Sequence, residues 1–223
     1  EYTGSYISRL DVQQRMIFSL LTTEMGGTCG LIAPDEVTLR YMEGRSRRPF
    51  VPVYGDPDVA YVRTIEIDVS SLDPQVAVPP QPTGTRPLTE AEGTEIQQAY
   101  IGGCTGGGIA DMRMAAGVLR GRKAHPEVRL IVVPGTQAIL DEMLREGLFQ
   151  VFSDAGAMVT PHYCGPCQML CVGNLGEGET MIGTHPRNSL GRTGKGTHIY
   201  LASPYSCAAS AVAGKIMDPR LYL

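Results

Sequence analysis

Short apolar stretches alternate with amphipathic stretches through the C-terminal part of the chain, and this pattern constrains the fold more than any other feature. The apolar stretches predict strands, and the stretches with apolar residues three and four positions apart predict helices. We expect strands at residues 99–101, 130–133 and 198–202 and helices at residues 109–120, 136–145 and 205–216. Strands that alternate with helices of this length form mainly parallel sheets with helices packed against them. The sequence therefore predicts an α/β fold over residues 89–223, a layered α/β/α domain with a mainly parallel sheet.

The N-terminal residues show a less regular pattern. Asp11 and Gln14 have the spacing of a capping box that opens a helix, whose apolar face includes Ile17 and Leu21. Glu24 continues the same face, so a carboxylate lies where packing would favour an apolar side chain. We interpret residues 1–50 as the end of a preceding α/β domain.

The stretch between these two parts contains a strand pattern and many prolines. Residues 61–69 alternate between apolar and polar, which predicts a strand. Before this stretch, residues 35–42 predict a short helix. Residues 72–88 carry too many prolines for regular structure. We therefore interpret residues 51–88 as a strand followed by a proline-rich connection, with the domain boundary in that connection.

Charge and composition exclude some classes of function. The chain has 223 residues with 19 Lys and Arg against 23 Asp and Glu, a net charge of -4, which argues against a nucleic-acid-binding surface. No apolar run approaches the roughly 18 residues of a membrane-spanning helix, and no secretory leader is evident. We expect a cytoplasmic protein. Because the chain begins with Glu1 rather than Met, we interpret it as a processed, trimmed or split product.

The six cysteines are too sparse for a disulfide scaffold and point to metal or redox chemistry. Cys164 and Cys167 form a CxxC motif, which fits either a redox dithiol or half of a metal site. Cys104 lies in a glycine-rich turn between a predicted strand and a predicted helix, a position that favours a thiolate. Two thiolates plus one suit an iron–sulfur cluster with one iron left without a protein ligand. Zinc stays an alternative, with Cys171, His162 or His185 as a fourth ligand.

Two arginines follow the CxxC motif in another glycine-bearing loop. Arg187 and Arg192 could present forked donors to carboxylate groups, which match the planar guanidinium. The alternative interpretation is a solvated surface loop. Their position after the thiol cluster favours anion binding.

These motifs together resemble the aconitase superfamily, and more closely the large subunits of its isopropylmalate isomerase and homoaconitase branch. The similar segments are residues 24–36 (EMGGTCGLIAPDE), 65–75 (IEIDVSSLDPQ), 101–111 (IGGCTGGGIAD), 132–135 (VVPG), 164–167 (CGPC) and 186–194 (PRNSLGRTG). The resemblance implies a [4Fe-4S] cluster held by Cys104, Cys164 and Cys167. It also implies Glu24 as the active-site glutamate and Arg187 and Arg192 as the arginines that bind substrate carboxylates.

The chain departs from the family pattern around this implied site. Gly106 stands where the family usually has Asn, Leu20 replaces an Asn near Glu24, and His185, Pro186 and Ser189 replace the family's Ser, Asn and Phe. These departures indicate an intact cluster in an altered polar pocket. The earlier domain and the swivelling domain of the family are not visible in this sequence, so we expect companion chains to supply them.

From the resemblance we expect part of an iron–sulfur-dependent hydro-lyase, a hydratase, dehydratase or isomerase component. Its substrate would be a small hydroxy di- or tricarboxylic acid. The alternative is a non-catalytic iron–sulfur or zinc protein with a sensing or scaffolding role.

Overall fold

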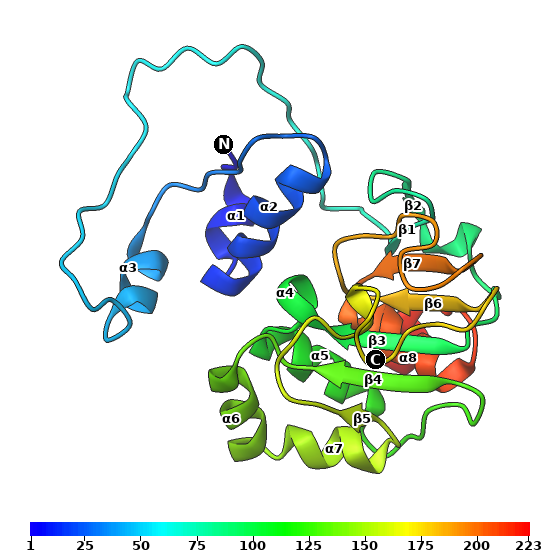
Figure 1. Ribbon diagram of the computed structural model, residues 1–223. Coiled ribbons are helices and arrows are strands. Elements are labelled where there is room, and N and C mark those ends of the chain that lie inside the picture. The colour runs from blue at the N-terminus through cyan, green and yellow to red at the C-terminus, as the bar shows by residue number, and fades with distance from the viewer. The chain divides into compact units, whose positions relative to one another are not determined.

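The computed structural model describes residues 1–223 and divides into two compact units, residues 1–72 (unit 1) and residues 73–223 (unit 2). Unit 1 contains three helices, and unit 2 contains a seven-stranded sheet with the remaining helices (Figure 1). No helix is long and apolar enough to cross a membrane.

Two of the three helices of unit 1 begin at acidic N-cap residues. Its elements are α1 (Ser5–Arg9), α2 (Val12–Glu24) and α3 (Glu36–Met42). The Asp11 carboxylate accepts from the Gln14 backbone N–H, and the Gln14 side chain accepts from the Asp11 N–H, so the predicted capping box is confirmed. The Asp35 carboxylate accepts from the backbone N–H groups of Val37 and Thr38 and caps the predicted second helix.

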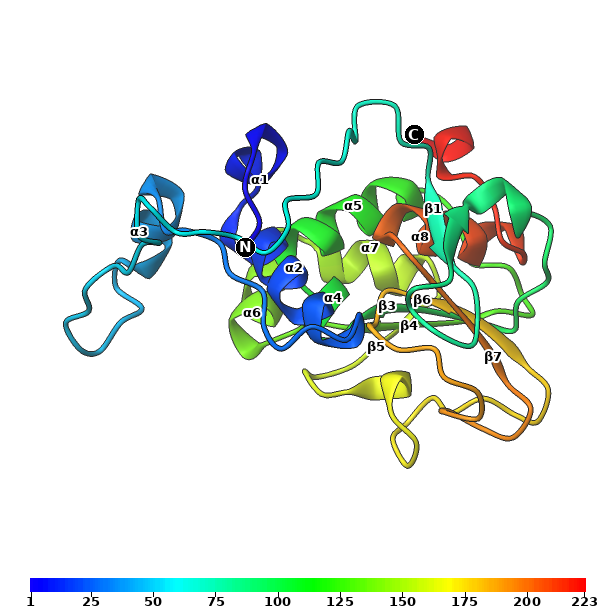
Figure 2. The same cartoon turned by 90° about the horizontal axis from the view of Figure 1, so that it is seen from above.

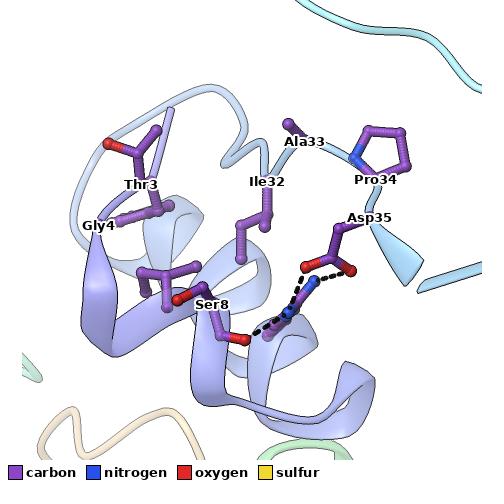
Figure 3. Close-up of a pocket in the computed structure, with 10 residues that line it drawn as sticks. Thr3, Gly4, Ser8, Ile32, Ala33, Pro34 and Asp35 are labelled. Carbon is purple, nitrogen blue, oxygen red and sulfur yellow. Dashed lines mark hydrogen bonds and ion pairs between the residues drawn. The ribbon is translucent and has the colours of Figure 1, made fainter. Parts of the chain in front are cut away.

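An ion pair between the buried Arg15 and the partly exposed Asp35 joins these two helices. Arg15 donates to both carboxylate oxygens of Asp35, at 2.7 and 2.8 Å, and also to the carbonyls of Leu10 and Ser8. The hydrogen bond from Arg15 lowers the pKa of Asp35 to about 2. The pair lines a cavity of about 220 Å³ beside Pro34 (Figure 3). Because Arg15 has partners for all three of its nitrogens within unit 1, we assign it a structural role.

The strand expected at residues 61–69 does not form, and that prediction is wrong for this structure. These residues are assigned to no strand, and no backbone hydrogen bond joins residues 61–68 to another segment. An alternating pattern specifies which side chains would share a face, but a strand also needs a neighbouring strand to pair with.

Unit 2 is built on a sheet with strand order β2-β1-β7-β6-β3-β4-β5. The five strands from β7 to β5 in that order are parallel, and β1 is antiparallel to both β7 and β2. The strands are β1 (Gln75–Ala77), β2 (Thr85–Pro87), β3 (Gln98–Gly102), β4 (Arg129–Val133), β5 (Met158–Val159), β6 (Thr180–Gly183) and β7 (His198–Ala202). The predicted α/β fold with a mainly parallel sheet is confirmed.

The helices of unit 2 contact one face of this sheet. They are α4 (Gly103–Gly106), α5 (Ile109–Leu119), α6 (Gln137–Arg145), α7 (Leu148–Asp154) and α8 (Pro204–Ala213), with short 3₁₀ turns η1 (Leu88–Glu90), η2 (Gly165–Cys167) and η3 (Pro219–Tyr222). Residues of α5 to α8 share a core with Ile101, Val132 and Ile182. Figure 2 shows α5, α7 and α8 on this side and the η2 loop on the other.

The opposite face of the sheet is covered by loops rather than by helices. Tyr100, Ile131 and Met181 point to this side and pack with Leu175 and Tyr163 from the loop that follows β5. Alternate residues of β3 therefore face two different layers, Ile101 toward the helices and Tyr100 toward the loops. Loops therefore form the third layer of this domain, where the expected α/β/α arrangement has helices.

The proline-rich connection holds more structure than expected. Pro74 directly precedes the short strand β1, and Pro87 is the last residue of β2, the edge strand of the sheet. Proline is tolerated there because an edge strand leaves one row of N–H groups unpaired. The last helix, α8, ends at Ala213 because Gly214 adopts a φ of 78°. Ile216, the end of the predicted helix, therefore lies beyond the observed one.

Candidate functional site

The site expected from the cysteines lies at the switch point of the sheet. From β3 the chain continues to β4 and β5 on one side, whereas β6 and β7 lie on the other side of β3. The loops that follow β3 and β6, after Gly102 and Gly183, therefore run in opposite directions. Open α/β sheets bind ligands at this position. Cys104 follows β3, and the loop with both candidate arginines follows β6.

The turn that carries Cys104 depends on glycine and on Thr184. Gly102 has a φ of 148°, and a side chain there would overlap with the backbone of Val133. The Thr184 hydroxyl accepts from the Gly102 N–H at 2.8 Å, and the Thr105 hydroxyl donates to the Thr184 carbonyl at 2.6 Å. These buried bonds fix the turn to the loop after β6 and leave Cys104 exposed.

The CxxC motif forms the tight turn η2 on the loop layer. Cys164 is the N-cap, and the Cys167 N–H donates to the Cys164 carbonyl at 3.3 Å. Gly165 has a φ of 56° and lies against Val133 and Tyr100, so a side chain at that position would press on both. Cys164 is exposed and Cys167 is half-buried, and neither forms a disulfide.

Tyr100 brings the two cysteine-bearing turns together. Its hydroxyl donates to the Cys164 carbonyl at 3.0 Å. A methyl group on Gly103 would lie 2.9 Å from this hydroxyl, and one on Gly165 would lie 3.4 Å from it. Burial raises the pKa of Tyr100, and the charges of Cys167, Cys104 and Cys164 raise it further. The Tyr100 hydroxyl therefore lies close to Gly103, the residue before Cys104, and to Gly165, the residue after Cys164.

Two opposing effects act on the ionisation of the Cys167 thiol. Burial raises its pKa, and Arg192 lowers it. Arg192 donates through Nε to the Cys167 carbonyl at 2.7 Å, and its Nη2 lies 4.0 Å from the Cys167 Sγ. Arg192 therefore holds the CxxC turn, a role that the sequence did not reveal. Arg187 is exposed on the same loop.

The remaining candidate residues are Glu24 and Cys171. Glu24 is the last residue of α2 and belongs to unit 1, so its place at the site stays a prediction. Cys171 is half-buried beyond η2. No three His, Cys, Asp or Glu side chains are close enough to hold a single metal ion. A four-iron cluster does not require that arrangement, since each thiolate binds a different iron.

His185 is buried beside the site without a hydrogen-bond partner. It is 2% exposed, and both ring nitrogens lack partners. The ring lies 5.4 Å from the ring of Tyr100, and it fits there because Gly183 has no side chain; a methyl group on Gly183 would lie 2.5 Å from Nδ1. Burial, and to a lesser extent Arg192, lowers the pKa of His185 to about 3. The imidazole is therefore neutral near pH 7.

Sequence reasoning missed Tyr100 and Thr184 because both resemble ordinary core residues of short strands. Tyr100 stands in an apolar strand, where an aromatic ring is usually a packing residue. The available signal was its position two residues before the glycine-rich turn.

The fold is that of an α/β protein with an open, mainly parallel sheet and with three cysteines in the loops at its switch point. Residues 1–94 and 83–214 match the model of the aconitase family (aconitate hydratase). The chain belongs to the aconitase family.

Relatives of this chain carry the name of one enzyme subunit. It is 47% identical over 220 residues to the 3-isopropylmalate dehydratase large subunit of Halothermothrix orenii, covering 98% of this chain and 52% of that protein. It is 47% identical over 221 residues to the protein of the same name from Heliobacterium modesticaldum, covering 99% and 53%. It is 42% identical over 224 residues to 3-isopropylmalate dehydratase large subunit 1 of Methanopyrus kandleri, covering 100% and 54%. The chain thus spans about half the length of these relatives.

Proposed function

We propose that Cys104, Cys164 and Cys167 hold a [4Fe-4S] cluster at the switch point of unit 2. Their chemistry fits this group, because cysteine thiolates are the usual ligands of iron–sulfur clusters. None of the three forms a disulfide, they come from two turns that lie close to one tyrosine hydroxyl, and their charges act on each other. When bound, the cluster would supply an open iron that acts as a Lewis acid toward a substrate oxygen.

The residues around the cysteines would hold this site in shape. Tyr100 fixes the carbonyl of Cys164, Thr184 fixes the turn before Cys104, and Arg192 fixes the carbonyl of Cys167. Arg192 also places positive charge beside the Cys167 sulfur, which favours the thiolate form needed for metal binding. These contacts prearrange the three ligands before any cluster binds.

We further propose that the chain is the cluster-bearing part of a hydro-lyase for a hydroxy di- or tricarboxylic acid. The names of the relatives support dehydration of a substrate of the isopropylmalate class. Arg187, exposed on the loop after β6, is then the better candidate for gripping a substrate carboxylate. Glu24 would contribute a carboxylate from unit 1 as an acid or base. The name "large subunit" supports a small-subunit companion, and the unmatched half of the relatives supports a further companion segment.

The observation that carries this proposal is the Tyr100 hydroxyl, which donates to the Cys164 carbonyl and lies close to Gly103, the residue before Cys104. The test is the hydration rate of the anaerobic complex of this chain with its companion segments, measured with an unsaturated diacid of the isopropylmalate class. Arg187→Lys keeps the charge but loses the planar fork, so we expect a loss of on the order of 2 to 4 kcal/mol in transition-state binding with unchanged iron content. An unchanged rate would remove Arg187 from substrate binding.

Arg192→Lys should behave differently, because Arg192 touches the cysteine turn itself. We expect it to lower iron content as well as rate. A second candidate function is that of a non-catalytic iron–sulfur protein. The contacts of Arg192 with Cys167 favour it, because they leave fewer Arg192 donors for a substrate. A complete, iron-loaded complex without any hydro-lyase turnover would favour that alternative.

A further inference from the structure

We propose that His185 donates a hydrogen bond to a sulfide of the bound cluster, on the side of Cys167, and thereby raises the reduction potential of that cluster. This inference rests on the proposed cluster at Cys104, Cys164 and Cys167. It goes beyond that proposal because it assigns a role to a residue that is not one of the three ligands.

The imidazole of His185 is buried with its hydrogen-bonding capacity unused. The residue is 2% exposed, and neither Nδ1 nor Nε2 has a hydrogen-bond partner. Whether neutral or protonated, an imidazole carries at least one N–H donor, and a buried donor without an acceptor is unfavourable. Most buried polar side chains have a partner. The His185 N–H therefore requires an acceptor that the chain itself does not supply.

His185 and Cys167 share two neighbours. The ring of His185 lies 5.4 Å from the ring of Tyr100, and Cys167 packs against the apolar cluster that contains Tyr100. Nη2 of Arg192 lies 4.0 Å from Sγ of Cys167, and Arg192 lowers the pKa of both Cys167 and His185. The unpaired imidazole thus lies on the loop side of the sheet, among the groups that surround the Cys167 thiol.

Gly183 determines which nitrogen of His185 can meet a partner. A methyl group on Gly183 would lie 2.5 Å from Nδ1 and 2.7 Å from Cε1, so this edge of the ring lies against the end of β6. Nε2 is left as the nitrogen for a partner outside the strand. The Cys167 sulfur is not that partner in this structure. A sulfide that binds together with the irons is a suitable acceptor, because hydrogen bonds to cluster sulfurs are common and set the reduction potential.

Two other partners of His185 predict different behaviour. No three His, Cys, Asp or Glu side chains lie close enough to hold a single metal ion, so the structure does not support His185 as the fourth ligand of a zinc site. A buried water molecule could accept the same N–H bond. A cluster sulfide becomes a better acceptor when the cluster takes up an electron, whereas an uncharged water molecule gains little. The reduction potential therefore distinguishes the two acceptors.

The test measures iron, sulfide and midpoint potential in the anaerobically reconstituted chain, reduced by one electron with dithionite and followed by electron paramagnetic resonance. His185→Leu removes the donor, so we expect unchanged iron and sulfide but a lower potential. The equilibrium constant for reduction should fall at least about tenfold, which is about 59 mV for one electron. His185→Gln supplies an amide N–H near the position of Nε2 and should restore most of the potential.

Thr193→Val is the matched control. Thr193 lies on the same loop, is 0% exposed, and its Oγ1 also lacks a partner, so this variant removes an equally buried polar atom and keeps His185. It should leave both iron content and potential unchanged. Loss of iron in both His185 variants, an unchanged potential in His185→Leu, or an equal shift in Thr193→Val would each overturn the role of His185. An unmodified chain without iron and sulfide would refute the proposed cluster itself, and this inference with it.

Discussion

Replacing Gly106 by alanine should destabilise unit 2, although the residue lies in a helix. Alanine in place of glycine usually stabilises a helix by roughly 0.5–1 kcal/mol. At Gly106 the added methyl group would overlap with the Cβ and Oγ1 of Thr184. These atoms are near the backbone and cannot swing away, so the overlap must be relieved by a backbone shift. Overpacking of this kind typically costs about 1–3 kcal/mol.

The shift would also strain the hydrogen bonds of Thr184. Its hydroxyl accepts from the Gly102 N–H and donates to the Gly102 carbonyl, both buried. Leaving a buried donor without its acceptor costs roughly a further 1–3 kcal/mol. The sum of these two costs, less the helix gain, leads us to expect that Gly106→Ala lowers the free energy of unfolding by about 1–5 kcal/mol.

The assay is urea unfolding followed by far-UV circular dichroism, since the chain has no tryptophan. Gly117→Ala is the control, because Gly117 lies in α5 with no atom within 4 Å of an added methyl group. It should stabilise the protein where Gly106→Ala destabilises it. In a Thr184→Gly background, which removes the overlapping side chain, the cost of Gly106→Ala should fall by more than about 1 kcal/mol. Equal costs in both backgrounds would refute this reasoning.

Three further predictions concern single side chains. Because burial lowers the pKa of His185 to about 3, the unfolded chain binds a proton there that the folded chain does not. Stability should therefore fall as the pH drops below about 6.5, by at most about 1.4 kcal/mol per pH unit. Urea midpoints at about pH 7 and pH 5 should differ less in His185→Phe than in the unmodified chain; an equal difference would show that His185 is not buried neutral. Tyr100→Phe should cost about 0.5–1.5 kcal/mol in the same unfolding assay through loss of the hydrogen bond to Cys164, and no change would contradict the assigned contact. The lowered pKa of Asp35 gives it a stabilising charge above its ordinary pKa of 3.8 that is lost as the pH falls through about 2. An acid titration of helix content should show this loss in the unmodified chain but not in Asp35→Asn, and identical titrations would contradict it.

Sequence reasoning predicted the elements whose side-chain periodicity is long enough to be distinct. The α5 helix and the strands β3, β4 and β7 are confirmed, because each combines a clear apolar pattern with a glycine or capping boundary. The four-residue strand β6 was missed, since residues 180–183 are too few to show a period and are preceded by a glycine-bearing turn.

The functional residues also fall into those that the sequence predicts and those that only the structure reveals. Thiol chemistry at Cys104, Cys164 and Cys167 could be expected from residue type and spacing. The contacts of Tyr100 and Arg192 with these turns depend on how distant loops meet above the sheet, and spacing along the chain does not contain that information.

The most direct test of the account is the iron and acid-labile sulfide content of the anaerobically reconstituted chain. The unmodified protein should contain about four irons and four sulfides per chain and absorb visible light. Serine at Cys104, Cys164 or Cys167 should remove most of both, while Cys171→Ser should keep them, because Cys171 lies beyond the η2 turn. Stoichiometric zinc without sulfide, or a loss of iron in Cys171→Ser equal to that in Cys167→Ser, would contradict the account.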